Sequence, residues 1–252
     1  MGLKRSLGSL RAFSALALAL SIVPVWLLTR RASPAARRME ERFFSRIVRG
    51  FGLEIAIEGT PMKSALFVVN HISWADIPVL ASVLDADFVA KSDIESWPVI
   101  GRLARRYDPV FVARDRRSGS RIQADAIRWR LDAGRSVILC PEGTTSDGTT
   151  ILPFRTSLFA AADANDVIQP VVIRYLAMDG SALPPKRQRE VAWIDDDELL
   201  AGAARVAREQ TLAHLTFLEP VRVSHFPDRK SLAEATRTVM LAAYATAPKR
   251  PM

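Results

Sequence analysis

The hydrophobic pattern divides the chain into a short apolar N-terminal part and a longer part in which apolar and polar stretches alternate. Residues 12–29 form a run of 18 residues without a charge, and Lys or Arg residues flank it on both sides. A helix that spans a bilayer needs about 20 apolar residues, so this run is just long enough. We therefore expect a membrane anchor, either a spanning helix or one that lies in the interface.

A cleaved signal peptide is the alternative interpretation of the same run. Basic residues follow the run directly, namely Arg30, Arg31, Arg37, Arg38 and Arg42. Basic flanks of this kind argue against cleavage and favour a retained anchor. Since Lys and Arg are more frequent after the run than before it, the rest of the chain is expected to face the cytoplasm. In a bacterium, this membrane would be the inner membrane.

Residues 34–51 carry apolar side chains at helical spacing, with arginines between them, and predict an amphipathic helix. Its apolar face would either contact a membrane or pack on the protein core, and the pattern does not choose between the two. Gly50 and Gly52 are expected to end the helix. The pattern thus separates an N-terminal anchor and amphipathic helix, 1–50, from a folded domain, 51–252.

The domain from residue 51 onward alternates short apolar runs with helical patterns, which predicts an α/β fold. We expect a mixed, largely parallel central sheet flanked by helices. The expected strands cover 53–57, 66–69, 88–90, 110–112, 137–139, 168–173, 191–194 and 215–218. The expected helices cover 74–85, 98–107, 118–133, 155–164, 196–209 and 229–246, and the run 183–189 (LPPKRQR) is expected to be an exposed loop.

Composition narrows the classes of partner. The net charge of +8 and the pI of about 10.2 favour either nucleic acid or an anionic membrane surface. The chain lacks a zinc-finger pattern and an aromatic RNA-binding segment, so we expect a membrane surface and no nucleic acid. The single cysteine, Cys140, excludes an intrachain disulfide and suits a reducing compartment. The acidic run 195–198 has no second acidic cluster beside it in the sequence, so no metal site is expected.

A first polar cluster follows the expected strand 66–69. Asn70 and His71 come at the strand end, and Ser73 and Asp76 have the spacing of a helix N-cap and its third helical residue. In open α/β sheets, ligands bind past the carboxyl ends of strands. The Asp76 carboxylate can reach back to an imidazole nitrogen of His71, which would leave the other nitrogen as a base. A simple helix cap beside an unrelated histidine explains the same residues equally well.

A second polar cluster follows the expected strand 137–139 and runs from Cys140 to Gly148. Its glycines and hydroxyls suit a loop that holds oxygen atoms, and Glu142 at the strand end can orient a hydroxyl or a backbone group. A glycine-rich turn with solvent-facing hydroxyls is the alternative. Cys140 ends an apolar strand, so we expect a buried structural thiol rather than a nucleophile.

Taken together in this order, the clusters are much more specific than either is alone. Asn70-His71-x4-Asp76, followed by Pro141-Glu142-Gly143-Thr144, resembles the glycerolipid acyltransferase family typified by 1-acylglycerol-3-phosphate acyltransferase. The run 111–114 resembles the family's second block, in which an arginine, here Arg114, contacts the glycerol phosphate. Residues 168–172 resemble the fourth block, and Lys91 matches a lysine implicated in phosphate binding in some members. The resemblance covers about residues 50–195.

This resemblance implies transfer of an acyl group from acyl-CoA or acyl carrier protein to the free hydroxyl of a lysolipid, without a cofactor. His71 would be the general base and Asp76 would hold it. Backbone N–H groups around Gly143 and Thr144 are candidate donors to the oxyanion. Glu142 and Thr145 complete the expected substrate-binding loop, together with Lys91 and Arg114.

The sequence departs from the family pattern at one position. Many members that form phosphatidic acid carry an arginine after Glu-Gly-Thr, where it meets the substrate phosphate, and this chain has Thr145 there. Arg155, Arg114 or Lys91 would have to compensate, or the acceptor is a different lipid. Lysophosphatidic acid is therefore the first expectation, and lyso-ornithine lipid or another lysophospholipid is the alternative.

Three further classes of protein fit the sequence less well. A non-catalytic membrane-surface protein of the same fold would not need the intact set His71, Asp76, Glu142 and Gly143. A serine hydrolase would carry G-x-S-x-G, which is absent from the chain. A nucleotide-dependent enzyme would carry a P-loop or G-x-G-x-x-G, and neither motif occurs.

Overall fold

The computed structural model describes residues 2–29, 33–91, 110–112, 117–163, 166–194 and 197–246. These residues form an eight-stranded mixed sheet with the order β1-β7-β6-β2-β5-β3-β4, and β8 pairs with β6. The strands are β1 (Leu53–Glu58), β2 (Leu66–Val69), β3 (Ala86–Lys91), β4 (Val110–Val112), β5 (Ser136–Leu139), β6 (Val167–Leu176), β7 (Thr211–Phe217) and β8 (Val221–Arg222). Strands β2 to β6 are mutually parallel where they pair, whereas β7 runs antiparallel to β6.

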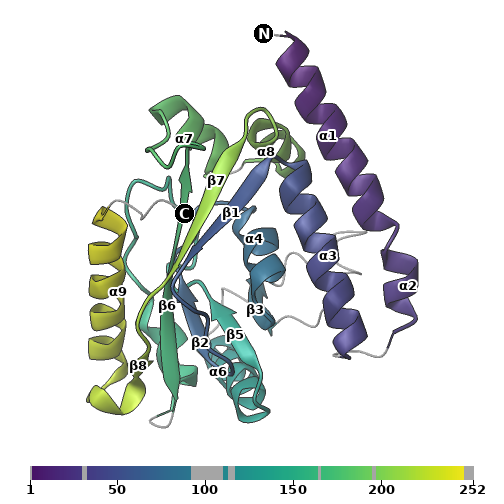
Figure 1. Cartoon of the computed structure of the whole chain (residues 1–252). Coiled ribbons are helices and arrows are strands. Elements are labelled where there is room, and N and C mark those ends of the chain that lie inside the picture. The colour runs from purple at the N-terminus through teal and green to yellow at the C-terminus, as the bar shows by residue number, and fades with distance from the viewer. Residues whose placement is uncertain are drawn as a thin grey trace.

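Helices cover both faces of the sheet (Figure 1). On one side lie α3 (Pro34–Gly50) and α4 (Asp76–Val83), with α1 (Gly2–Leu20) and α2 (Val23–Leu27) outside them. On the other side lie α6 (Arg117–Asp132), the 3-10 helix η2 (Thr156–Ala161) and α9 (Arg229–Ala245). The helices α7 (Pro185–Val191) and α8 (Leu199–Val206) contact each other near the start of β7, and η3 (Val223–His225) follows β8.

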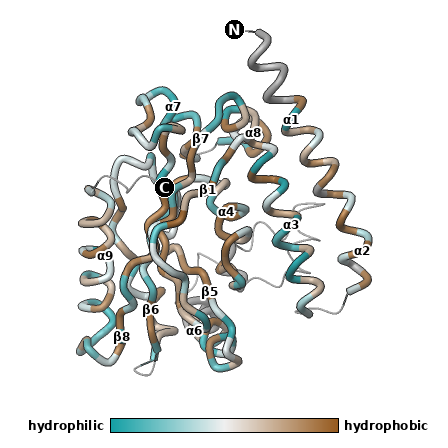
Figure 2. The backbone as a smooth tube through the Cα atoms, in the orientation of Figure 1, coloured by the Kyte–Doolittle hydropathy of each residue, from teal (hydrophilic) through white to brown (hydrophobic). Residues whose placement is uncertain are grey.

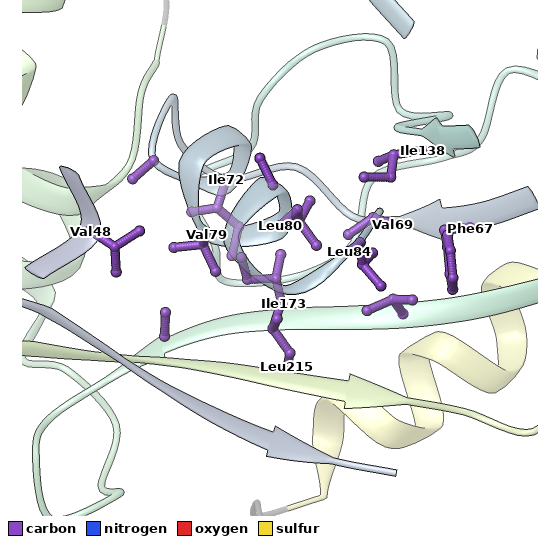
Figure 3. Packing of buried hydrophobic residues seen from close by; sticks show 14 of the residues in the cluster. Val48, Phe67, Val69, Ile72, Val79, Leu80, Leu84, Ile138, Ile173 and Leu215 are labelled. Carbon is purple, nitrogen blue, oxygen red and sulfur yellow. The ribbon is translucent and has the colours of Figure 1, made fainter. Parts of the chain in front are cut away.

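Strand β2 shows why its sequence is an unbroken apolar run. Phe67 and Val69 face the core beneath α3 and α4, whereas Leu66 and Val68 face the core beneath α6 and α9. A central strand of a sheet that is covered on both faces needs apolar residues at every position. Figure 3 shows the first core from close by, where Val79 and Leu80 of α4 pack toward Ile173 of β6.

The predicted fold class is confirmed, and the observed strands overlap seven of the eight expected ones. The strand expected at 191–194 was wrong, because Val191 ends α7 and the Trp193 N–H donates to the Ile72 carbonyl in the turn after β2. The helix expected at 155–164 is the shorter η2, and the one expected at 98–107 lies outside the described residues.

The exposed loop expected at 183–189 was also wrong, since most of it belongs to α7. Arg187 within it is buried, and its guanidinium donates to the carbonyls of Arg205, Val206 and Glu209. A buried arginine is tolerated here because backbone carbonyls accept hydrogen bonds from both of its terminal nitrogens. The basic run therefore ties α7 to the end of α8 rather than facing solvent.

The N-terminal helices pack against the domain through α3. Ala36, Val48 and Gly50 of α3 are buried, and a Cβ atom on Gly50 would stand 2.0 Å from the Cβ atom of Ala15. Helix α3 contacts both α1 and α4, which favours core packing as the role of its apolar face. In Figure 2 much of α1 and α2 is coloured as hydrophobic. Within the described residues, no helix has the length and hydropathy that a membrane crossing requires.

Candidate active site

His71 and Asp76 meet in the turn between β2 and α4. The His71 Nδ1 atom and the Asp76 Oδ2 atom lie 2.7 Å apart. The same carboxylate oxygen accepts the backbone N–H groups of Ile72, at 2.8 Å, and Ser73, at 3.0 Å. The predicted contact between the two side chains is therefore present. Because one ring nitrogen faces the carboxylate, the tautomer with a proton on Nδ1 is favoured and Nε2 is left as the acceptor.

The predicted helix cap formed only in part. The Asp76 carboxylate accepts the Ser73 N–H as expected, but α4 begins at Asp76 and its N-cap is Ala75. The Ser73 hydroxyl instead donates to the Val191 carbonyl at 2.7 Å. Ser73 therefore fixes the turn to the end of α7, while the Asp76 carboxylate contacts the imidazole.

Tyr175 is a site residue that the sequence did not reveal. Its hydroxyl donates to the Asp76 Oδ1 atom at 2.7 Å from the buried strand β6. Desolvation, and then the negative charge of Asp76, raise the pKa of the Tyr175 hydroxyl well above its usual range, so it remains a donor. Both oxygens of Asp76 are thus hydrogen-bonded. Nothing in a single sequence signals a contact between residues 99 positions apart.

Asn70 clamps the strand ends that carry the site. Its side-chain amide donates to the Ile173 carbonyl at 3.0 Å, and its side-chain oxygen accepts the Ile173 N–H at 2.8 Å. Both partners are backbone atoms of β6, so Asn70 continues the ladder beyond the last residue of β2. The residue before His71 is therefore held in one place.

Glu142 holds the backbone of His71 from the next strand end. Its Oε1 atom accepts the His71 N–H at 2.7 Å, and its Oε2 atom accepts the Leu152 N–H at 2.8 Å. Burial raises the pKa of the Glu142 carboxyl to about 7, because desolvation outweighs the hydrogen bonds from both backbone groups. The sequence expectation that Glu142 orients a backbone group thus agrees with its contacts.

The glycine-rich loop from Cys140 to Gly148 wraps around the same turn. The Ser146 N–H donates to the His71 carbonyl at 2.8 Å, and the Thr145 hydroxyl donates to the Trp193 carbonyl. The Gly143 N–H closes a turn onto the Cys140 carbonyl at 3.1 Å, so the exposed Thr144 provides the amide that remains our candidate oxyanion donor.

Lys91 and Arg114 are the two other residues that were predicted to contact the substrate. Lys91 ends β3, where it pairs with Val112 of β4, and Arg114 lies outside the described residues. Desolvation, followed by the charges of Asp76 and Glu142, raises the pKa of the Cys140 thiol well above its usual range, which disfavours a thiolate nucleophile. In the described part of the chain, no group of three or more potential metal ligands is close enough to hold an ion.

Comparison with known proteins places these motifs in a family. A sequence model described as Acyltransferase matches residues 52–174. The chain is 39% identical over 246 residues to the lyso-ornithine lipid O-acyltransferase of Brucella abortus, covering 90% of this chain and 91% of that protein. It is 33% identical to the Pseudomonas aeruginosa protein of the same name, covering 97% and 95% of the two chains.

Two other comparisons involve 1-acylglycerol-phosphate acyltransferases. The 1-acyl-sn-glycerol-3-phosphate acyltransferase of Neisseria gonorrhoeae is 36% identical over 129 residues, which cover 49% of this chain and 51% of that protein. The crystal structure of the 1-acyl-sn-glycerophosphate (LPA) acyltransferase of Thermotoga maritima has a TM-score of 0.70 at 20% identity, covering 98% of this chain and 99% of that one. The latter similarity shows a shared fold.

Proposed function

The chain belongs to the acyltransferase family, and from this premise we propose that it transfers a fatty acyl group from an acyl thioester to the hydroxyl of lyso-ornithine lipid. O-acyltransferase activity on lysolipids is the common activity of the relatives named above. The observation that carries the chemistry is the 2.7 Å contact between His71 and Asp76. A protein that only bound membranes would not need this pair.

The general base in the proposed reaction is His71. Its side chain is 22% exposed while that of Asp76 is 1% exposed, so a substrate reaches the imidazole and not the carboxylate. Nε2 takes the proton of the acceptor hydroxyl as its oxygen attacks the thioester carbonyl carbon. General-base assistance of this kind typically contributes about 10²–10⁴-fold to the rate. Asp76 stabilises the imidazolium that forms.

The second half of the reaction returns this proton. The tetrahedral intermediate collapses, the carbon–sulfur bond breaks, and the imidazolium gives its proton to the departing thiolate. The products are the ester and the free thiol, so the step balances without a cofactor. The Thr144 N–H is the proposed donor to the oxyanion of the intermediate. The donor is acyl-CoA or acyl carrier protein.

The choice of acceptor rests on two observations. Relatives named for lyso-ornithine lipid match over nearly the whole chain, whereas the Neisseria enzyme named for 1-acyl-sn-glycerol-3-phosphate matches over about half. In addition, this chain has Thr145 at the position where many phosphatidic-acid-forming members have an arginine. The Thr145 hydroxyl donates a hydrogen bond to the Trp193 carbonyl. Lysophosphatidic acid is the second candidate, favoured by the Neisseria match.

Membrane attachment is the remaining part of the proposal. Apolar side chains of α1, α2 and the C-cap of α2 are exposed, including Phe13 at 72% and the C-cap residue Leu28 at 88%. Arginines fasten this segment to the domain, since Arg11 donates to the Gly50 carbonyl at 3.2 Å and Arg46 donates to the Leu18 carbonyl at 2.9 Å. We propose that this surface contacts the lipid on the cytoplasmic side of the membrane, where the net charge of +8 favours anionic headgroups.

An acceptor panel tests the proposed reaction. Membranes containing the protein would receive a labelled acyl thioester with lyso-ornithine lipid, lysophosphatidic acid or lysophosphatidylcholine. Membranes with the His71→Ala variant serve as the control for other enzymes. Labelling that is strongest with lyso-ornithine lipid and depends on His71 supports the proposal. Labelling of lysophosphatidic acid alone would move the assignment to the second candidate.

A further inference from the structure

Arg155 lies directly against the glycine-rich loop of the site. Its backbone N–H donates to the Pro141 carbonyl at 2.8 Å, at the residue before Glu142. Its side chain crosses Gly143 so closely that a Cβ atom there would stand 2.6 Å from the Nε atom of Arg155. Glu142, next to Pro141 in the chain, holds the backbone of His71, so Arg155 is bonded to the same loop that positions the proposed base.

Gly143 is the residue that permits this approach. Its φ angle is +68°, in the left-handed region that favours glycine. A side chain at this position would in addition collide with the Arg155 guanidinium, whose Cζ atom is 2.9 Å from the Cβ position. The loop therefore offers a flat backbone surface on which the arginine side chain rests.

The positive charge of Arg155 is not paired with a carboxylate among the described residues. Other arginines on this end of the fold pair with carboxylates, such as Arg205 with Asp197 and Arg208 with Glu190. Among the residues that the structure describes, no carboxylate forms an ion pair with Arg155, and its side chain is exposed. A cation in this setting is available to an anionic group of a bound molecule.

We propose that Arg155 binds the anionic group of the acceptor headgroup, which in lyso-ornithine lipid is the carboxylate of ornithine. This inference rests on the proposed function. The planar guanidinium matches a carboxylate with two parallel hydrogen bonds, a geometry that a lysine ammonium does not reproduce. Arg155 would thereby supply the cation that Thr145 does not.

Steady-state kinetics of Arg155 variants test this assignment. Arg155→Gln removes the charge and Arg155→Lys keeps it without the planar fork. Arg222→Gln is the matched control, because Arg222 is exposed on β8, which pairs with the start of β6 rather than with its site end. For each variant, KM would be measured for lyso-ornithine lipid, for lysophosphatidic acid and for the acyl thioester, together with kcat and the thermal midpoint.

The expected result is a KM for lyso-ornithine lipid that rises about tenfold or more in Arg155→Gln, as loss of a charge-assisted contact implies. The KM of Arg155→Lys for lyso-ornithine lipid should lie between those of Arg155→Gln and wild type. The KM for the thioester, kcat, the thermal midpoint and all values for Arg222→Gln should change less than about twofold or 2 °C. If only the KM for the thioester rises, Arg155 binds an anionic group of the acyl donor and the proposal is overturned. It is also overturned if kcat alone falls, or if neither KM nor kcat changes.

The two proposals fail in different ways. If wild type acylates lysophosphatidic acid and not lyso-ornithine lipid, the proposed acceptor is wrong. The phosphate of lysophosphatidic acid would then be the anion that Arg155 binds. In that case a raised KM for lysophosphatidic acid in Arg155→Gln supports the role of Arg155, and an unchanged KM excludes it. If wild type acylates lyso-ornithine lipid and Arg155→Gln keeps the wild-type KM, only the present inference fails.

Discussion

The Tyr175 hydroxyl donates a hydrogen bond of 2.7 Å to the Oδ1 atom of Asp76. The Oδ2 atom of the same carboxylate faces His71 and two backbone N–H groups. The carboxylate is therefore fixed at both oxygens, and its orientation toward the imidazole does not depend on a single contact. The base of the proposed reaction is positioned from β6 as well as from its own turn.

Replacement of this tyrosine tests that positioning role. Tyr175→Phe leaves a buried carboxylate oxygen without its side-chain donor, which should destabilise the fold by about 1–3 kcal/mol. We expect kcat to fall about tenfold and the KM for the acceptor to change little. Tyr244→Phe is the comparison, because it also removes a hydroxyl bonded to a protein oxygen, the Gly148 carbonyl. If both variants lower kcat equally, Tyr175 has no specific effect on the base.

The raised pKa of Glu142 predicts a pH-dependent stability. Its folded pKa of about 7 lies above the ordinary value of 4.5, so the folded protein holds this proton more tightly than the unfolded chain. The stabilisation is fully present below about pH 4.5 and is lost as the pH rises to about 7. Its size is roughly 3 kcal/mol, since one pKa unit corresponds to about 1.4 kcal/mol.

Urea unfolding of wild type and Glu142→Gln between pH 4.5 and 7.5 measures this contribution. The variant is less stable overall, because its amide nitrogen cannot accept a backbone N–H. Its free energy of unfolding should nevertheless fall less than that of wild type over this range. Parallel profiles for the two proteins would show that Glu142 is already ionised at the lower pH.

Gly143 and Gly134 form a matched pair for testing the contact with Arg155. Both have φ near +70°, but a Cβ atom on Gly134 would meet nothing within 4 Å. Gly134→Ala should therefore cost only the backbone strain, about 1–2 kcal/mol. Gly143→Ala should cost more, and the excess should disappear in the double variant with Arg155→Ala. Equal costs for the two single variants would contradict a close approach of Arg155 to the loop.

The exposed apolar surface of α1 and α2 predicts membrane binding. Phe13→Glu together with Leu28→Glu should release a large part of the protein from anionic phospholipid vesicles in a flotation assay, because a charged side chain opposes burial in lipid. Leu200→Glu is the control, since Leu200 is 83% exposed on α8. If the double variant floats as wild type does, another surface makes the contact.

Much of the sheet could be predicted from local pattern. Continuous apolar runs such as that of β2 are typical of strands covered on both faces, and the His71–Asp76 pair follows from a strand end directly before a helix start. Each of these signals lies within a few neighbouring residues. The family resemblance added the relation between this turn and the loop at Glu142.

The features that the sequence did not reveal depend on distant partners. Arg187 looked solvent-exposed because its neighbours are basic, yet its buried guanidinium donates to carbonyls in the last turn of α8 and just after it. The segment 191–194 has the composition of a strand, but Val191 ends α7 and the Trp193 N–H donates to the Ile72 carbonyl in the turn after β2. Tyr175 lies on the same face of β6 as Val171 and Ile173, so nothing local distinguishes it from a core residue.

The turnover of His71→Ala with lyso-ornithine lipid and a labelled acyl thioester tests whether His71 is the general base. We expect kcat to fall by about 10²–10⁴-fold, the contribution of a general base, while the thermal midpoint stays near that of wild type because the imidazole is partly exposed. Turnover within a few-fold of wild type in a folded His71→Ala protein would contradict this role.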